Sequence, residues 1–144
     1  MNILEMTKQQ IFDVVVQGLA SQGWMHSLDG THCKYRGAKG TKCAAGHLID
    51  DYMYSYELEQ KAADSYDLAA VLGYTKEDYD HPSNRDQLRF VRDLQQVHDN
   101  SAAPYLNCDS NYRYTPEEAA EIMRQRYMDY ANSYDLRFNE EKVA

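Results

Sequence analysis

The stretch from residue 31 to residue 51 constrains the fold most, because its character changes repeatedly over a short length. Residues 32–36 alternate polar and apolar side chains, which is typical of a short strand. Residues 37–42 contain two glycines, which readily adopt the positive φ angles of a turn. Residues 43–54 begin with small apolar side chains and predict a buried helix. Gly46 within that helix predicts the close approach of another backbone, near the strand, because glycine otherwise destabilises a helix.

Capping patterns mark the starts of the longer predicted helices. Residues 7–10 form a capping box, and the following apolar side chains recur with a helical period. Residues 84–87 repeat the pattern, and residues 115–118 place Thr, Pro and two acids at a third start. Residues 99–114, rich in Asn, Ser and Asp, predict a loop, and residues 136–144 predict a frayed tail.

Between the first and second of these helices, the chain contains shorter apolar runs. Residues 58–63 and 65–72 predict two short helices, and residues 75–78 predict one further helical turn. We therefore predict a mainly α fold, a small helical domain of about five to six helices with one short β-hairpin. Residues 1–144 are expected to form a single domain.

The negative charge of the chain is concentrated in one segment. The whole sequence carries a formal charge of −8, and residues 50–80 hold nine acids and two bases, a charge of −7. The same segment holds six of the 13 tyrosines. An acidic chain disfavours direct nucleic-acid binding through a broad basic face. Three cysteines, with no predicted signal peptide or long apolar run, indicate a reducing cytosol, no disulfide framework and no membrane partner.

Three short motifs resemble a family of small uncharacterised proteins found in tailed-phage genomes. They are C-x-Y-R from Cys33, G-x-K-C-A-x-G-x-L-I from Gly40, and L-Q-x-x-H-D from Leu94. The chain departs from that family at Asp50, where the family usually has proline, and at His47, where a small residue is common. The resemblance implies a phage origin and a shared fold, and it implies no reaction mechanism.

Cysteine and histidine side chains offer a possible zinc site. Cys43 and His47 are four residues apart on one predicted helical face, and Cys33 precedes them on the strand. A fourth ligand would come from His32, His98 or Cys108. No C-x-x-C knuckle is present, and a buried free cysteine behaves as a small apolar residue. Our main interpretation is therefore burial, with no metal ligand, no cofactor and no catalytic residue.

The adjacent pair His98–Asp99 also has two interpretations. It could form a catalytic or metal-binding pair, or His98 could simply favour the C-terminal end of a helix through the helix dipole. The sequence contains no serine-hydrolase, zinc-protease or phosphate-loop motif beside the pair. We therefore favour the second interpretation.

The acidic, tyrosine-rich segment is the predicted functional surface. Carboxylates and phenol rings on one face would suit a partner with a basic surface, and the competing interpretation is an ordinary solvated acidic face. The predicted partner-binding residues are Asp50, Asp51, Tyr52, Tyr54, Tyr56, Glu57, Glu59, Asp64, Asp67, Glu77, Asp78 and Asp80.

The sequence thus predicts a non-enzymatic phage protein in the cytoplasm of the infected bacterial host. It would bind a host protein used in defence or nucleic-acid handling, and inhibit or modulate it. The alternative is a zinc-stabilised module or metal-dependent enzyme centred on Cys33, Cys43 and His47.

Overall fold

A computed structural model describes residues 1–29, 32–37, 39–106 and 114–140, with backbone alone at residues 29, 32 and 102–106. The fold is mainly helical, as predicted. Its elements are η1 (Ile3–Glu5), α1 (Lys8–Ser21), β1 (Leu28–Asp29), β2 (His32–Cys33), η2 (Ala45–Leu48), η3 (Asp51–Met53), η4 (Tyr56–Gln60), α2 (Tyr66–Val71), α3 (Lys76–Asp80), η5 (Pro82–Asn84), α4 (Arg85–Leu106) and α5 (Pro116–Ser133), where η denotes a 3-10 helix.

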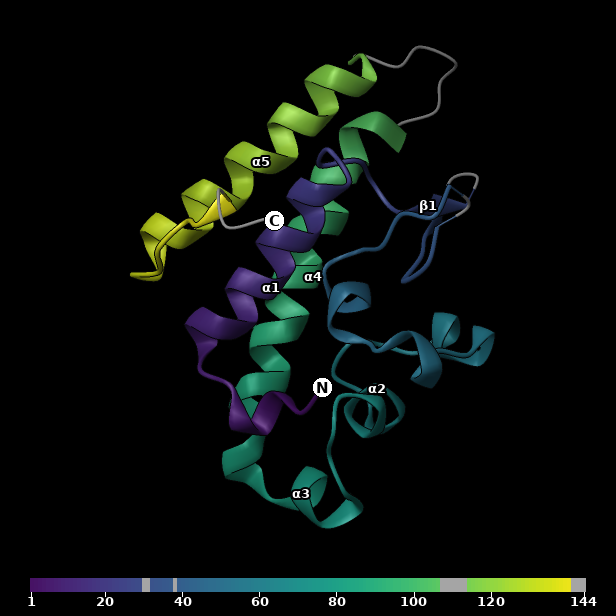
Figure 1. Ribbon diagram of the computed structural model, residues 1–144, viewed down its shortest axis with the longest axis vertical. Coiled ribbons are helices and arrows are strands. Elements are labelled where there is room, and N and C mark those ends of the chain that lie inside the picture. Colours follow the sequence, from purple (N-terminus) through teal and green to yellow (C-terminus); the bar gives the residue numbers. More distant parts are fainter. Residues whose placement is uncertain (30–31, 38, 107–113, 141–144) are drawn as a thin grey trace.

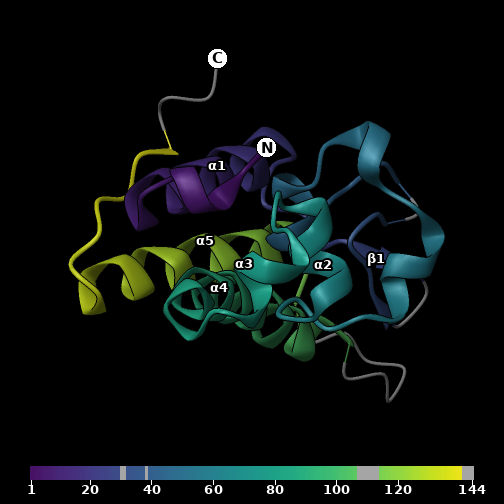
Figure 2. The same ribbon diagram turned by 90° about the horizontal axis from the view of Figure 1, so that it is seen from below.

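The long helix α4 lies at the centre of the molecule, and α1 and α5 both contact it (Figure 1). The strands and the 3-10 segments η2, η3 and η4 lie together on one side of these helices, while α2 and α3 lie towards the N-terminal end of α4 (Figures 1 and 2). Among the described residues, no helix is both long enough and apolar enough to cross a membrane.

The predicted helix starts at Thr7 and Thr115 are confirmed. In each case the threonine side chain accepts a hydrogen bond from the backbone N–H of the third helical residue, and the side chain of that residue accepts one from the threonine backbone N–H. The predicted apolar face of α1 is buried, and it comprises Ile11, Phe12, Val15, Val16 and Leu19. Tyr127 of α5 is fully buried against α4, where its hydroxyl donates to the Leu94 carbonyl at 2.7 Å. This bond satisfies the phenol inside the core.

The predicted helix over residues 43–54 is wrong, because two separate 3-10 segments, η2 and η3, occupy that range. Between them Ile49 and Asp50 are extended. The Ile49 carbonyl accepts a hydrogen bond from Arg36 at 2.8 Å, and the Asp50 carboxylate pairs with the N-terminal ammonium group. Because these distant partners keep Ile49 and Asp50 extended, a continuous helix cannot form through them.

The predicted close approach at Gly46 is confirmed. A Cβ atom at this position would lie 2.2 Å from the carbonyl oxygen of Tyr35, far inside contact distance. The neighbouring backbone is therefore that of the segment following β2, and only glycine fits beside it.

The predicted β-hairpin over residues 32–42 is not supported. The two strands contain two residues each and pair Leu28 with Cys33, while Arg36 and Lys42 form an isolated bridge. The backbone N–H groups of Tyr35 and Arg36 donate instead to the Glu59 carboxylate, at 2.8 and 3.1 Å. A side chain thus replaces the partner strand that the alternating pattern predicted.

The predicted loop over residues 99–114 begins too early, because α4 continues to Leu106. Residues 107–113 lie outside the described residues. Pro104 has no N–H and so cannot bond to the carbonyl of Asn100, four residues earlier. Arg126 of α5 donates to that carbonyl at 2.8 Å instead. A neighbouring helix therefore supplies the missing donor, and α4 runs through the proline.

The predicted frayed tail needs correction up to residue 140. Arg124 forms two-pronged hydrogen bonds with Glu140, and the Phe138 ring lies 5.9 Å from that of Trp24. The backbone N–H of Arg137 donates to the Gln9 side chain at 2.9 Å. The charged composition of the tail therefore reflects specific pairing. Residues 141–144 lie outside the described residues.

Candidate functional site

Three large side chains project from the 3-10 segments that begin the acidic region. Tyr52 and Tyr56 are 83% and 70% exposed, and Met53 between them is 39% exposed. Glu57 is also exposed and has no ion-pair partner among the described residues. We call these four residues the tyrosine patch. Tyrosine and methionine side chains are enriched at protein–protein interfaces.

The segments that carry the tyrosine patch are held by half-buried and exposed polar contacts. Both oxygens of Glu59 accept hydrogen bonds, from the Tyr35 and Arg36 backbone and from the Tyr54 hydroxyl at 2.6 Å. The Arg36 guanidinium group lies 5.1 Å from the Tyr54 ring centre and donates to Asp51 at 2.6 Å. Hydrogen bonds from Arg36 and then Lys42 lower the pKa of Asp51. These contacts fix the segments that carry the tyrosine patch, which reduces the conformational entropy lost on binding.

Most other acids of the region already have partners inside the chain. Asp50 pairs with the N-terminal ammonium group, and Asp78 serves the capping box that begins α3. The remaining pairs are Asp64–Arg92, Asp67–Lys61 and Asp80–Lys76, at 3.1, 3.6 and 2.8 Å. Within the described part of the chain, Glu57 and Glu77 remain unpaired. Although this region carries a formal charge of −7, most of its nine carboxylates are already occupied by partners within the chain.

The six tyrosines of the region also divide into different roles. Tyr74 is buried and donates to the Asn84 carbonyl at 2.6 Å. Tyr66 and Tyr79 meet edge to face, with ring centres 5.3 Å apart. Tyr54 is half-buried over Arg36. The structure thus exposes only part of the predicted tyrosine surface, and the most exposed rings are those of the tyrosine patch.

A second candidate site joins β2 to α4. Ligand-type atoms of Cys33, His98 and Asp99 lie within 4.8 Å of one another. Of the predicted zinc ligands, Cys33 and His98 meet here, whereas Cys43 and His47 do not belong to the group. The other two candidates for a fourth ligand, the side chains of His32 and Cys108, lie outside the described part of the chain. Cys33 and Asp99 line a cavity of about 370 Å³ that Glu59 and Gln95 also border.

Hydrogen bonding in this cluster converges on the Asp99 carboxylate. Its Oδ1 atom accepts from Gln95 at 2.9 Å and lies 3.0 Å from His98 Nδ1. The backbone N–H of Ser27 donates to His98 Nε2 at 3.2 Å, so the proton of the neutral ring is on Nδ1 and is donated to Asp99. Burial, followed by the charge and hydrogen bond of Asp99, raises the pKa of the Cys33 thiol to about 12.

These protonation states do not suit a zinc site. His98 would have to release its Nδ1 proton to bind a metal, while Nε2 already accepts from Ser27. Such a ring would be an imidazolate, whereas zinc-binding histidine is normally neutral and donates its other N–H. The thiol of Cys33 also lacks the low pKa of reactive cysteines. The arrangement suits a hydrogen-bonded connection between β2 and α4 better than catalysis.

The other two predicted zinc ligands have packing roles. Cys43 is fully buried, and its sulfur accepts from the Gly46 N–H at 3.4 Å. The His47 ring lies against α1, so closely that a Cβ on Gly18 would come within 2.4 Å of its Nδ1 atom. Burial, followed by the nearby positive charges of Lys42 and Arg36, lowers the pKa of His47 to about 4.

The sequence did not indicate the roles of two residues that organise these sites. Arg36, in the segment after β2, binds Asp51 of η3 and the Ile49 carbonyl. The Asp99 carboxylate contacts the side chains of Cys33, Gln95 and His98. The adjacent pair His98–Asp99 is a sequence signal for the second, but the prediction that His98 ends a helix is wrong, because α4 continues to Leu106. No local pattern marks Arg36, because its partners are 13 and 15 residues away.

No protein-family model, curated protein or solved structure matches this chain. The resemblance to phage proteins therefore stays a prediction, and function has to be inferred from the geometry of the sites.

Proposed function

We propose that this chain is a non-enzymatic protein that binds another protein through the tyrosine patch. The observation that carries the proposal is the exposure of Tyr52, Met53 and Tyr56 on segments that Glu59 and Arg36 connect to the chain after β2. Large exposed rings on a rigid support favour binding, because they add contact area with little loss of conformational freedom.

The proposed partner has a basic surface. Glu57 lies within the tyrosine patch, and the chain as a whole carries a charge of −8. Arginine and lysine side chains stack favourably on tyrosine rings, and complementary charge accelerates association. Following the sequence resemblance, we propose a phage protein acting in the cytoplasm of an infected bacterium. It would inhibit or modulate a host protein of defence or nucleic-acid handling.

The experiment is an affinity purification from infected cells with a matched set of variants. The test variant combines Tyr52→Ala with Tyr56→Ala, both at exposed positions, so the fold should be retained. Each removed ring is expected to weaken binding about tenfold if it anchors the interface. Glu117→Lys is the charge control, because this exposed acid lies on α5, outside the tyrosine patch.

The proposal requires one partner that is lost with the double variant and retained with Glu117→Lys. Recovery of the same partners by all three proteins would refute it. Reversing Asp51 or Glu59 is a poor test, since these carboxylates hold Arg36 and the backbone beside it.

The zinc-containing alternative has a separate test. Metal analysis of purified protein would have to show stoichiometric zinc, and a chelator would have to lower the melting temperature. The hydrogen bonds that both nitrogens of the His98 ring already make argue against that result.

A further inference from the structure

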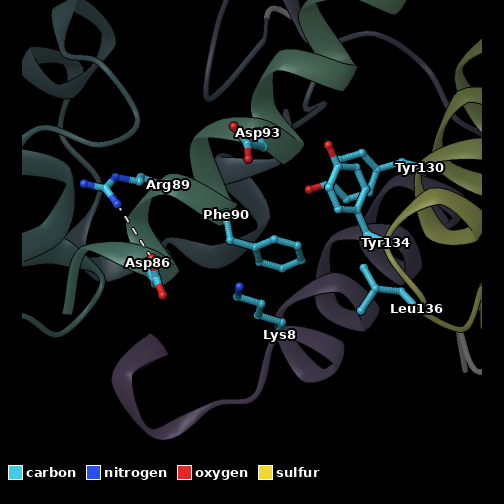
Figure 3. A pocket seen from close by; sticks show the side chains of 8 residues that line it. All are labelled: Lys8, Asp86, Arg89, Phe90, Asp93, Tyr130, Tyr134 and Leu136. Carbon is cyan, nitrogen blue, oxygen red and sulfur yellow. Dashed lines mark ion pairs between the residues drawn. The ribbon is translucent and has the colours of Figure 1, made fainter. Parts of the chain in front are cut away.

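A pocket between three helices lies apart from both sites described above. It has a volume of about 280 Å³, and its lining comes from α1, α4, the end of α5 and the residues after it. Figure 3 shows its residues, which are Lys8, Asp86, Arg89, Phe90, Asp93, Tyr130, Tyr134 and Leu136. None of them belongs to the tyrosine patch.

Aromatic rings form the centre and one wall of this pocket. Tyr130 and Tyr134 are stacked with ring centres 4.4 Å apart, and Phe90 lies beside them (Figure 3). Tyr134 is 62% exposed, so the second face of its ring is open to a ligand. Neither tyrosine hydroxyl has a hydrogen-bond partner within the described ranges. The pocket thus offers an aromatic surface together with free polar groups.

Carboxylates from one face of α4 complete the pocket. The side chains of Asp86 and Asp93 are 74% and 49% exposed, and their nearest ion pairs are loose, at 3.7 and 3.9 Å. Arg89 points away from the aromatic rings in Figure 3, towards Asp86. Burial, followed by the charge of Asp93, raises the pKa of Tyr130 to about 12. The lining thus carries two carboxylates and two cations, Lys8 and Arg89, and Asp93 is the carboxylate whose charge acts on Tyr130.

One cation of the protein already lies over an aromatic ring of this pocket. The ammonium group of Lys8 lies 5.8 Å from the centre of the Phe90 ring, within the usual range of a cation–π contact. The open face of Tyr134 offers a second position of the same kind. A planar guanidinium group suits it better than an ammonium group, because it can stack on a ring and also bond to a carboxylate with two N–H groups.

We propose that this pocket binds an arginine side chain of a partner protein, stacked on Tyr134 and paired with Asp93. The inference does not depend on the tyrosine patch, because no residue is shared between the two sites. It adds a proposed arginine-binding site on another part of the molecule.

The test uses a blocked tripeptide, acetyl-Gly-Arg-Gly-amide, titrated against the whole protein with NMR detection of the aromatic ring signals. The proposal expects saturable shifts of Tyr134, Tyr130 and Phe90. Tyr134→Ala and Asp93→Asn should each weaken binding by at least about threefold. The matching lysine tripeptide should bind more weakly than the arginine tripeptide. Glu117→Gln is the control, since it removes an exposed carboxylate outside the pocket and should leave the affinity unchanged.

Lys8→Gln distinguishes a site for cations from a site for anions. Removing this positive charge should strengthen binding of the arginine peptide, because the two cations repel each other in the pocket. Weaker binding to Lys8→Gln would overturn the proposal, and so would the absence of saturable ring shifts. Shifts confined to Tyr52 and Tyr56 would also overturn it, while supporting the tyrosine patch as a separate site.

Discussion

Two buried histidines should make the stability of this protein fall steeply between pH 6.5 and pH 4. Burial is the main cause that lowers the pKa of His26 and of His47 to about 4 in the folded chain. In the unfolded chain each imidazole has a pKa of about 6.5. Between these values the unfolded state binds more protons, so acidification favours unfolding.

The size of the effect follows from the difference in pKa. At pH 5 each histidine should lower the free energy of unfolding by about 2 kcal/mol relative to pH 7.5, or about 4 kcal/mol for the two. Small domains are stable by only about 5 to 15 kcal/mol in total. Asp51 and Glu140 have lowered pKa values, so their contributions are lost mainly at more acidic pH, near the ordinary carboxylate pKa of about 4.

Urea unfolding at a series of pH values measures this effect. Near pH 5 the free energy of unfolding should change by about 2.5 kcal/mol per pH unit, which corresponds to the uptake of almost two protons. His47→Gln should roughly halve that slope, whereas His81→Gln, at an exposed position, should leave it unchanged. A flat profile between pH 6.5 and 5, or an unchanged slope in His47→Gln, would refute this reasoning.

Two further predictions concern positions where single groups hold the chain together. Gly46→Ala should destabilise the protein by about 1 to 3 kcal/mol in urea unfolding, because the new methyl group meets the Tyr35 carbonyl. Gly40→Ala is the control, because the added methyl group would meet no atom within 4 Å and the substitution therefore tests backbone conformation without crowding. Asp99→Asn should lower the pKa of the Cys33 thiol and so speed its reaction with a thiol reagent at pH 8. An unchanged rate at equal stability would show that burial alone suppresses the thiol.

The sequence predicted the fold best where local signals agree with packing. Thr7 and Thr115 begin helices through side chains three residues away, and the apolar period of α1 matches its buried face. Prediction failed over residues 43–54 and 99–106, where distant groups decide the conformation. Arg36 holds Ile49 in an extended conformation, and Arg126 allows α4 to continue through Pro104. Neither contact leaves a local pattern.

For the candidate sites too, the sequence predicted what local composition determines and missed what distant contacts determine. Composition indicated the acidic, tyrosine-rich segment, yet it could not tell the exposed ring of Tyr52 from the buried ring of Tyr74. It also could not separate the free carboxylate of Glu57 from that of Glu59, which serves the backbone. Cys33 was grouped with Cys43 and His47 by proximity in sequence, whereas the structure places it beside Asp99. Spatial grouping of polar side chains depends on tertiary contacts that spacing does not reveal.

The bond from Arg126 to Asn100 makes the end of one helix dependent on the arrival of another. Before α5 docks, the carbonyl ahead of Pro104 lacks its protein donor, so the final turns of α4 lose one source of support. Any motion that separates the two helices removes this bond and should loosen α4 first at its C-terminal end.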